Sequence, residues 1–515
     1  MSVRVRFAPS PTGSLHVGSL RDALFKHLFA RHHKGANILR IEDTDRARYS
    51  AEAEQDFIDN LHWVGIDYDE GPHVGGPHAP YRQSERKEAG IYARWIDEFL
   101  KLGHAYKAFE TPEELVEMRE FQQVNRQPVG YFGGLWRDAA PSQAEDAERA
   151  GKPFVIRQRV PRGVTIAIDD AIRGRIEWNS DTVDDPVLIK ADGMPTYHFA
   201  AMVDDHLMGI THIMRGEEWI SSAPKHAALF DAFGWERPIF VHCPVIKGKD
   251  GKKLSKRQGD TRVADYRADG YLPEALLNLI ALIGWSPGGD REIMSIQELI
   301  EAFDLPGLQP SPGVFDLEKL RWMNGHYIRE MAPHRLAASL RAYLAEPGTK
   351  AYFLREAEAD DALEQGRREV WDGLSSLAVG LEEGAALATK ALAMEQGRVH
   401  TLSEFGEATA FFFQDEPPMD AKAVEKWLTQ PHVPVLLAHF LAWATGMSAL
   451  SVEECEAAVR GYAEKQGLEK LGPVVHPLRV ALTGRTVGPG LFELMSALGP
   501  ARMAARLARA VGAAR

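Results

Sequence analysis

The N-terminal residues show two periodicities of apolar positions. Apolar and polar side chains alternate over residues 2–7, which predicts a strand. Leucines then recur on one face of a helix that is expected to end at Gly35: Leu20, Leu24 and Leu28. The apolar run 38–41 predicts a second strand. Strand, helix and strand in this order predict a right-handed βαβ unit with a parallel sheet, whose ligands bind beyond the C-terminal strand ends, at the loop Pro9–Gly18.

The pattern changes farther along the chain. Residues 86–195 mix helical and strand-like segments, which we interpret as an α+β insertion after the parallel-sheet segment 1–85. The parallel fold should resume over residues 196–246, and a loop rich in glycine and lysine opens the segment 247–330. Residues 331–515 are rich in Ala, Leu and Glu and predict amphipathic helices in two subdomains. The expected fold class is therefore α/β, with a Rossmann-like parallel sheet, an insertion and an all-α C-terminal region.

Composition narrows the class of protein. The chain has 515 residues, 45% hydrophobic and 26% charged, and is too long for a single core. Its two cysteines, Cys243 and Cys455, exclude a disulfide framework and fit a reducing cytosol, so we expect a cytoplasmic protein. No apolar secretory segment is visible near the N-terminus, and the most apolar run, Leu276–Trp285, is too short to cross a membrane. The net charge of −13 argues against general DNA coating, yet residues 247–257 carry six Lys or Arg against one Asp.

Two distant segments carry candidate chemistry. The first is Phe7-Ala8-Pro9-Ser10-Pro11-Thr12-Gly13-Ser14-Leu15-His16-Val17-Gly18-Ser19. It places His16 at a helix start, where free N–H groups and the helix dipole attract phosphate. The second is Lys253-Leu254-Ser255-Lys256-Arg257, a lysine pair beside a glycine-rich loop that could close over a triphosphate. Alone, His16 would be interpreted as a packing residue at a helix start, and the lysine segment as a solvated loop. Their occurrence together favours a phosphate-binding site.

These two segments resemble the HIGH and KMSKS signatures of class I aminoacyl-tRNA synthetases. The sequence of residues 7–13, together with Arg40-Ile41-Glu42-Asp43-Thr44-Asp45, narrows the resemblance to bacterial glutamyl-tRNA synthetases. Residues 476–485 and 488–492 resemble the C-terminal end of the proteins of that family. The resemblance implies ATP-dependent ligation of L-glutamate to the 3′ end of tRNA(Glu) through a glutamyl-adenylate, with release of AMP and diphosphate. It also implies acceptor-stem binding by the insertion, stem contacts by residues 247–330 and anticodon binding by the helical region.

The functional residues of that family can be placed on matching positions. The catalytic residues would be His16, Lys253 and Lys256. The ATP-binding residues would be Pro9, Gly18, Ser19, Lys253, Ser255 and Lys256. The glutamate-binding residues would be Arg6, Ala8, Ser10, Glu42, Tyr197 and Arg215, with the two arginines gripping carboxylates through their guanidinium forks. Weaker candidates for tRNA binding are Arg398, Arg479 and Arg485. Ser19 stands where the superfamily often has a second histidine, and Arg257 where it often has serine.

We expect Mg²⁺ to arrive with ATP and the protein to hold no structural zinc. Some glutamyl enzymes hold zinc in the insertion through a Cys-x-Cys pair, but Ala108 and Glu110 occupy those positions here, so the thiolate ligands are missing. His32 and His33, adjacent on the first helix, are expected to point apart into solvent. From the resemblance we further expect tRNA(Glu), L-glutamate and ATP as partners, no membrane and a monomer.

Three alternatives remain at this point. Glutaminyl-tRNA synthetase has a related catalytic half, but its anticodon region consists of β-barrels, and residues 331–515 lack the alternating strands these need. A class I-like nucleotidyltransferase could share the histidine and lysine signatures but would have no use for a long helical region. A non-enzymatic RNA-binding protein would not need a phosphate site together with a pocket lined by arginine and glutamate.

Overall fold

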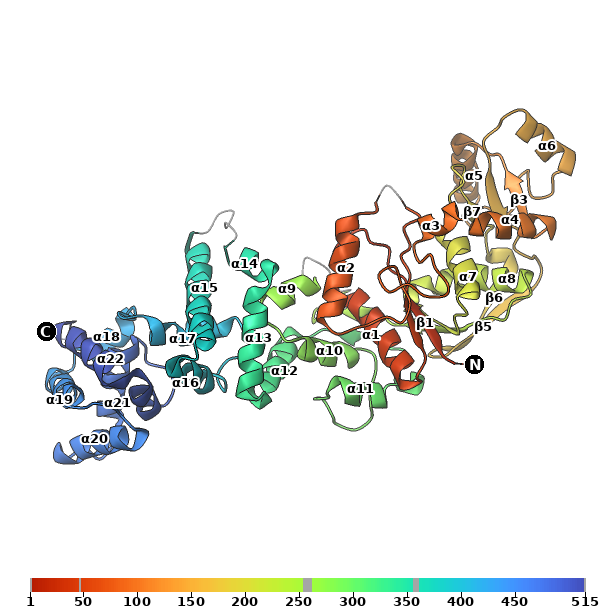
Figure 1. Cartoon of the computed structure of the whole chain (residues 1–515). Coiled ribbons are helices and arrows are strands. Elements are labelled where there is room, and N and C mark those ends of the chain that lie inside the picture. The colour runs from red at the N-terminus through yellow and green to blue at the C-terminus, as the bar shows by residue number, and fades with distance from the viewer. Residues whose placement is uncertain (1, 46–47, 253–261, 355–360, 514–515) are drawn as a thin grey trace. The chain divides into compact units, whose positions relative to one another are not determined.

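The computed structural model describes residues 2–45, 48–252, 262–354 and 361–513 (Figure 1). Lys253, Ser255 and Lys256 of the predicted site lie outside these residues. The chain forms two compact units, one of Met1–Val263 with Leu277–Asp316 and the other of Ala264–Leu276 with Leu317–Arg515. The five domain ranges drawn from the sequence are finer than this division and stay predictions.

The N-terminal strand, helix and strand form a parallel βαβ unit, and the predicted α/β class is confirmed. Strand β1 (Arg4–Phe7) pairs in parallel with β2 (Ala36–Leu39), in a register that runs from Arg4↔Ala36 to Phe7↔Leu39. Helix α1 (Val17–His32) connects the two strands and ends shortly before Gly35. On the other side of β1, the Thr211 N–H donates to the Arg4 carbonyl at 2.9 Å. This bond joins β1 to the start of β8 (His212–Gly216), which pairs in parallel with β9 (Ile239–Cys243).

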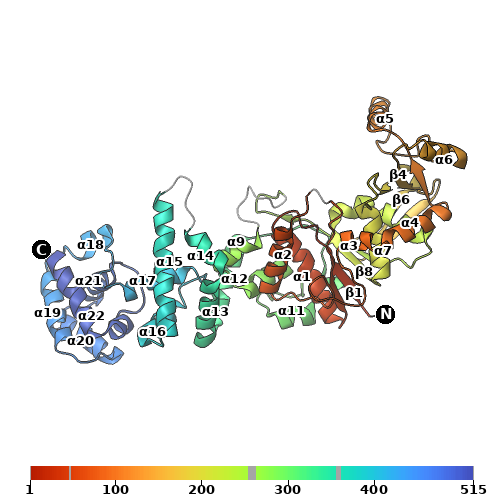
Figure 2. The same ribbon diagram turned by 45° about the horizontal axis from the view of Figure 1, so that its top comes forward.

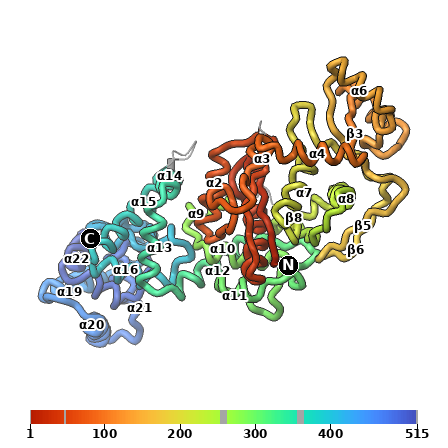
Figure 3. The backbone as a smooth tube through the Cα atoms, turned by 45° about the vertical axis from the view of Figure 1, so that its right-hand side comes forward, coloured from red at the N-terminus to blue at the C-terminus, as the bar shows by residue number. Residues whose placement is uncertain are grey.

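The remaining strands of the first unit belong to the insertion and to the far edge of the sheet. β5 (Thr165–Asp170) and β6 (Gly174–Asn179) form an antiparallel hairpin that continues the parallel pair in the order β6-β5-β9-β8. β3 (Ala105–Ala108), β4 (Val155–Gln158) and β7 (Val187–Ile189) form a separate antiparallel sheet. The tube in Figure 3 follows the chain out through α4 to β3 and α6 and back to β5.

The helices of the first unit cover these sheets. They are, after α1, α2 (Ala51–Trp63), α3 (Gln83–Glu88), α4 (Ile91–Lys101), α5 (Pro112–Val124), α6 (Pro141–Arg149), α7 (Tyr197–Leu207), α8 (Ala223–Ala232) and α11 (Ile296–Ala302). The short strands β10 (Ile246–Lys247) and β11 (Gly313–Val314) pair in parallel. Phe199 of α7 and Phe230 of α8 are fully buried beside Ile213 of β8 and Phe240 of β9, so these helices are fixed against the parallel strands.

The second unit is helical, as the sequence predicts. Its helices are α9 (Val263–Ala268), the first half of α10 (Pro273–Ala281), α12 (Leu317–Glu330), α13 (Pro333–Ala345), α14 (Pro347–Leu354), α15 (Asp361–Glu382), α16 (Ala386–Glu395), α17 (Glu404–Phe413), α18 (Ala421–Trp427), α19 (Val433–Thr445), α20 (Val452–Lys465), α21 (Gly472–Thr483) and α22 (Leu491–Ala513). No strand occurs among the residues that the structure describes in this unit. Across the described helices of the whole chain, none is both long and apolar enough to span a membrane.

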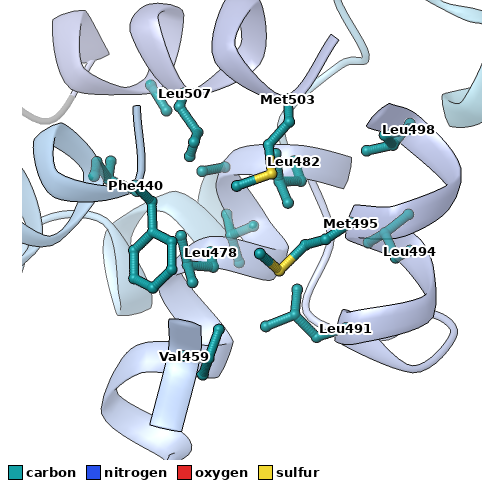
Figure 4. Packing of buried hydrophobic residues seen from close by; sticks show 14 of the residues in the cluster. Phe440, Val459, Leu478, Leu482, Leu491, Leu494, Met495, Leu498, Met503 and Leu507 are labelled. Carbon is teal, nitrogen blue, oxygen red and sulfur yellow. The ribbon is translucent and has the colours of Figure 1, made fainter. Parts of the chain in front are cut away.

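Close packing of side chains and backbones fixes the helices of the second unit. Helices α19, α20 and α21 pack around α22 (Figure 2), and apolar side chains such as Phe440, Val459 and Leu478 fill the space between them (Figure 4). Between α15 and α17 the backbones approach so closely that a Cβ on Gly373 would lie 2.1 Å from the carbonyl oxygen of Gly406. Glycine is therefore required at this crossing.

Candidate active site

A cavity of about 650 Å³ lies in the first unit, where β1, β8 and β9 end and α1 begins. Ten predicted site residues that the structure describes line it: Arg6, Ala8, Pro9, Ser10, His16, Gly18, Ser19, Glu42, Tyr197 and Arg215. These residues come from segments as far apart as β1 and β8, so the parallel sheet brings them together at one edge. Ile246 and Arg262, on either side of the undescribed residues 253–261, also line the cavity. The expected roles of Lys253, Ser255 and Lys256 stay predictions.

The loop after β1 is held against the end of β2 by backbone hydrogen bonds. The Arg40 N–H donates to the Phe7 carbonyl at 3.0 Å, and the Glu42 N–H donates to the Pro9 carbonyl at 2.9 Å. Continuing the pairing past the strand ends brings the Glu42 side chain beside the loop. The position of Glu42 therefore follows directly from the register of β1 and β2.

His16 is the N-cap residue of α1. Its Nδ1 accepts a hydrogen bond from the Ser19 N–H at 3.2 Å, and its Nε2 lies 3.1 Å from the Ser19 hydroxyl. A neutral imidazole that accepts at Nδ1 carries its proton at Nε2, so His16 donates from Nε2 to the Ser19 Oγ. A Cβ on Gly18 would lie 3.0 Å from the imidazole, so glycine leaves room for this ring. Because both ring nitrogens of His16 face Ser19, the hydrogen-bond donors that can face the cavity here are N–H groups at the start of α1.

Arg6 belongs to a buried network of charges beneath the cavity. Its Nε donates to Oδ1 of Asp205 at 2.8 Å, and Arg40 donates to the same oxygen at 2.6 Å. Arg40 also donates to Glu42 Oε1 at 2.9 Å. Burial would raise the pKa of Asp205, but the two guanidinium groups outweigh burial and lower it. For Glu42, burial raises the pKa and Arg40 offsets only part of the rise.

Arg215, the second predicted arginine, has different partners. Its Nε donates to His242 Nε2 at 3.1 Å, and its Nη1 lies 2.9 Å from His226 Nδ1. Burial lowers the pKa of Arg215. Tyr197, whose pKa is raised by burial, packs against Trp219 with ring centroids 4.3 Å apart and the ring planes tilted by 37°, and both residues line this side of the cavity.

Several polar residues of the cavity were not predicted from the sequence. Lys26 forms an ion pair with Asp22 one helical turn earlier on α1, and Arg21 of the same helix donates to the Pro244 carbonyl. Oppositely charged residues four positions apart on a helix usually lie on its solvated face. The spacing of Asp22 and Lys26 therefore gave no reason to place this pair at a cavity. Asp205 was also missed, although a carboxylate pair inside the apolar run of α7 is a usable signal.

The three weak tRNA candidates lie in the second unit around one buried carboxylate. Glu395 at the end of α16 is 3% exposed and pairs with Arg398 at 3.1 Å. Burial raises its pKa, while Arg398, Arg485 and Arg479 act in the opposite direction. Arg479 donates to the Pro489 carbonyl and Arg485 to the Glu407 carbonyl at 3.2 Å. Three arginines thus gather near Glu395, and Arg485 also lies 3.6 Å from the Glu407 carboxylate.

The positions considered for metals hold other interactions. Ala108 is buried in β3, and Glu110 accepts a hydrogen bond from the Tyr131 hydroxyl at 2.5 Å. The expectation that His32 and His33 point apart is wrong, although His33 is exposed to solvent as expected. Their rings lie 4.7 Å apart, His32 Nδ1 contacts the Ile300 carbonyl at 2.9 Å, and His33 Nε2 contacts Asp304 at 3.1 Å. Helix α11 and the residues directly after it pack against the end of α1, a long-range contact that the periodicity of α1 alone cannot show.

Comparisons with known proteins agree with this geometry. Residues 2–322 match the family "tRNA synthetases class I (E and Q), catalytic domain", and residues 336–511 match the family "Anticodon binding domain". A glutamate–tRNA ligase of Thermus thermophilus is 43% identical over 99% of this chain and 100% of its own length. The corresponding protein of Desulforamulus reducens is 41% identical over the same shares. A crystal structure of a glutamate–tRNA ligase from Elizabethkingia meningosepticum in complex with its amino acid superposes with a TM-score of 0.86, at 35% identity and full coverage of both chains.

Proposed function

The chain belongs to the class I tRNA synthetases of the glutamate and glutamine group, and we propose that it ligates L-glutamate to tRNA(Glu) at the expense of ATP. The reaction would form glutamyl-adenylate and diphosphate, then transfer the glutamyl group to the 3′ end of the tRNA and release AMP. The observation that carries the proposal is the presence of Arg6 and Arg215 in the cavity that also holds His16 and the start of α1. One cavity thus offers cations for carboxylates and donors for phosphates.

Each step can be assigned to residues of this cavity. Arg6 and Arg215 would bind the carboxylates of glutamate, and Glu42 would face its ammonium group. ATP would place its phosphates at His16 and the N-terminal turn of α1, and Lys253 and Lys256 would approach them from the segment after β10. Such a site acts by positioning the reactants and by stabilising charge on the α-phosphate as the substrate carboxylate attacks.

Magnesium would be carried by the phosphates of ATP. Asp22 pairs with Lys26 and Glu42 pairs with Arg40, so these two carboxylates of the cavity are already engaged. A Mg²⁺ ion prefers substrate phosphates and water in such a setting. No step of the proposal depends on a protein-bound metal.

The helical second unit favours tRNA(Glu) over the glutaminyl alternative. The described residues 317–354 and 361–513 form helices without a strand, whereas the glutaminyl enzymes that the catalytic half resembles have β-barrels in this position. The anticodon family match over residues 336–511 supports an RNA-binding role for this unit. Arg398, Arg479 and Arg485 are proposed to face the RNA backbone, where guanidinium groups suit phosphate oxygens.

Charging of purified tRNA tests this function. With labelled L-glutamate and ATP, the protein should convert tRNA(Glu) to its glutamyl ester and release AMP in equal amount. Exchange of diphosphate into ATP should be near background with glutamate alone and should rise when tRNA(Glu) is added, as the family resemblance implies. A protein that makes no glutamyl ester under these conditions would not be a glutamate–tRNA ligase.

A further inference from the structure

Arg215 is held by neutral groups on the sides that face away from the cavity. Its Nε donates to His242 and its Nη1 to His226, while Nη2 lies 3.5 Å from the Trp219 carbonyl oxygen. In the part of the chain that the structure describes, no carboxylate lies within salt-bridge distance of Arg215. Arg6, by contrast, pairs directly with Asp205. The two arginines of one cavity therefore differ in how much of their charge the protein itself neutralises.

The contacts of Arg215 define the protonation of both histidines. A guanidinium group has only donors, so each imidazole nitrogen that faces it must be an acceptor. His242 therefore carries its proton on Nδ1 and donates it to Asp170 Oδ2, 2.6 Å away. His226 likewise carries its proton on Nε2 and donates it to His198 Nδ1, 2.9 Å away. Both rings are fully buried, and burial lowers the pKa of each, so both are neutral near pH 7.

Asp170 fixes the far end of this arrangement. Burial would raise its pKa, but hydrogen bonds from His242 and from the backbone N–H groups of Ile172 and Arg173 outweigh burial and lower it. The Ile172 and Arg173 N–H groups each donate to Oδ1 at 3.0 Å, and the backbone N–H of His242 donates to Oδ2 at 3.1 Å. Asp170 is thus a rigid anion at the end of β5. It holds the His242 ring in the one tautomer that can accept from Arg215.

We propose that His226 and His242 are positioning residues that aim the Arg215 guanidinium at the cavity while leaving its charge for the side-chain carboxylate of the substrate. The proposal rests on the function proposed above and extends it to amino-acid selection. A carboxylate in place of either imidazole would hold Arg215 equally well but would neutralise it. The cavity would then favour an anionic substrate less, and the neutral amide of glutamine would be rejected less strongly.

Matched substitutions separate this role from simple space filling. His226→Asn and His226→Asp have the same shape and both place an oxygen near the former Nδ1, but only the Asp variant brings a negative charge to Arg215. The pair His242→Gln and His242→Glu makes the same comparison at Nε2. His212→Gln is the control, because His212 lies at the start of β8, away from the end that carries Arg215, and does not line the cavity.

Steady-state charging of tRNA(Glu) by the full chain is the test. The KM for glutamate of His226→Asp should exceed that of His226→Asn by at least ~10-fold, with the KM for ATP equal in the two variants to within about 2-fold. The preference for glutamate over glutamine should fall in the Asp variant, and His212→Gln should behave as the wild type. Thermal melting checks that each variant folds, and the pair at position 242 gives the answer if a variant at 226 does not.

Two results would overturn the proposal and can be told apart from failure of the function itself. Equal glutamate KM values in folded Asn and Asp variants would show that the charge of Arg215 is not what the histidines preserve. Equal changes in the KM for ATP and for glutamate would show a structural role only. If the wild-type protein makes no glutamyl-tRNA, the function is wrong and the variants say nothing about positioning.

Discussion

Arg6 and Asp205 form a buried ion pair, with the Arg6 Nε atom 2.8 Å from Oδ1 of the carboxylate and both side chains almost inaccessible to water. Arg40 donates to the same oxygen, so one carboxylate holds two guanidinium groups. The arrangement anchors the end of β1 to α7 and fixes the direction from which Arg6 reaches the cavity. Because Asp205 pairs with Arg6, a proposed glutamate-binding residue, we expect Asp205 to contribute both to the stability of the fold and to substrate binding.

Replacing this carboxylate by its amide should therefore be costly. Asp205→Asn leaves Arg6 and Arg40 buried with only part of their counter-charge, and breaking such a pair costs about 3–5 kcal/mol of unfolding free energy. Urea unfolding measures the loss. Glu177→Gln, at the exposed pair with Arg175 on β6, is the control and should leave the unfolding midpoint unchanged. An Asp205→Asn protein as stable as wild type would show that the pair is not the anchor described above.

Lys256 should be essential for activation although it lies outside the described residues. Ile246 and Arg262, which lie before and after Lys256 in the sequence, line the cavity, and this supports a place for Lys256 near the phosphates of ATP. Lys256→Ala should lower the charging rate by ~100-fold or more, as expected for loss of one preorganised charge. The KM for glutamate should change little.

The matched control for Lys256 is Lys249, which pairs with Asp316 at 3.0 Å in the described part of the same segment. Lys249→Ala should keep near-wild-type turnover. Comparable rates for the two variants would remove the phosphate role from Lys256.

Stability should fall as the pH falls below neutral. Burial and nearby Arg31 lower the pKa of His27 on α1 to about 4. In the unfolded chain this histidine titrates near its ordinary pKa of about 6.5, so between these values the unfolded state binds the extra proton. The contribution of His27 is complete above about pH 6.5 and is lost as the pH falls towards 4, by about 2 kcal/mol at about pH 5.

Comparing urea unfolding at about pH 7 and about pH 5 tests this linkage. His27→Gln should show a smaller decrease in unfolding free energy than wild type over that interval. His62→Gln, at an exposed position of α2, should follow the wild type. Identical decreases for wild type and His27→Gln would mean that His27 is not held neutral by its surroundings.

Local patterns were sufficient to predict one wall of the cavity. The alternation of apolar and polar residues over 2–7 predicted β1 and placed Arg6 near the end of this strand. The helical spacing of leucines that follows placed His16 at the start of the helix, as the structure has it. The positions of these two residues depend only on the residues next to them in the sequence, so the periodicity of apolar residues is enough to predict them. Arg215 was reached only through the family resemblance, because an arginine after a short strand has no distinctive pattern.

The supporting residues could not be predicted in this way. Asp170, His226 and His242 come from β5, α8 and β9, and their significance appears only when the sheet order β6-β5-β9-β8 brings them beside Arg215. Likewise, no local signal assigns residues 264–276 to the second unit while 277–316 belong to the first. Both the contacts of Arg215 and the division into units depend on which distant segments pack together, and a single sequence does not show this.

The selectivity between glutamate and glutamine on tRNA(Glu) tests the central claim most directly. The measurement is kcat/KM for each amino acid with the wild-type protein, with Arg215→Ala as the comparison. A cavity with one neutralised and one unneutralised buried arginine should charge glutamate and discriminate against glutamine by at least ~10⁴-fold, because the amide would leave guanidinium donors unpaired. Arg215→Ala should lose most of this ratio. Efficient charging of glutamine by the wild-type protein, or no charging of glutamate, would contradict the assignment.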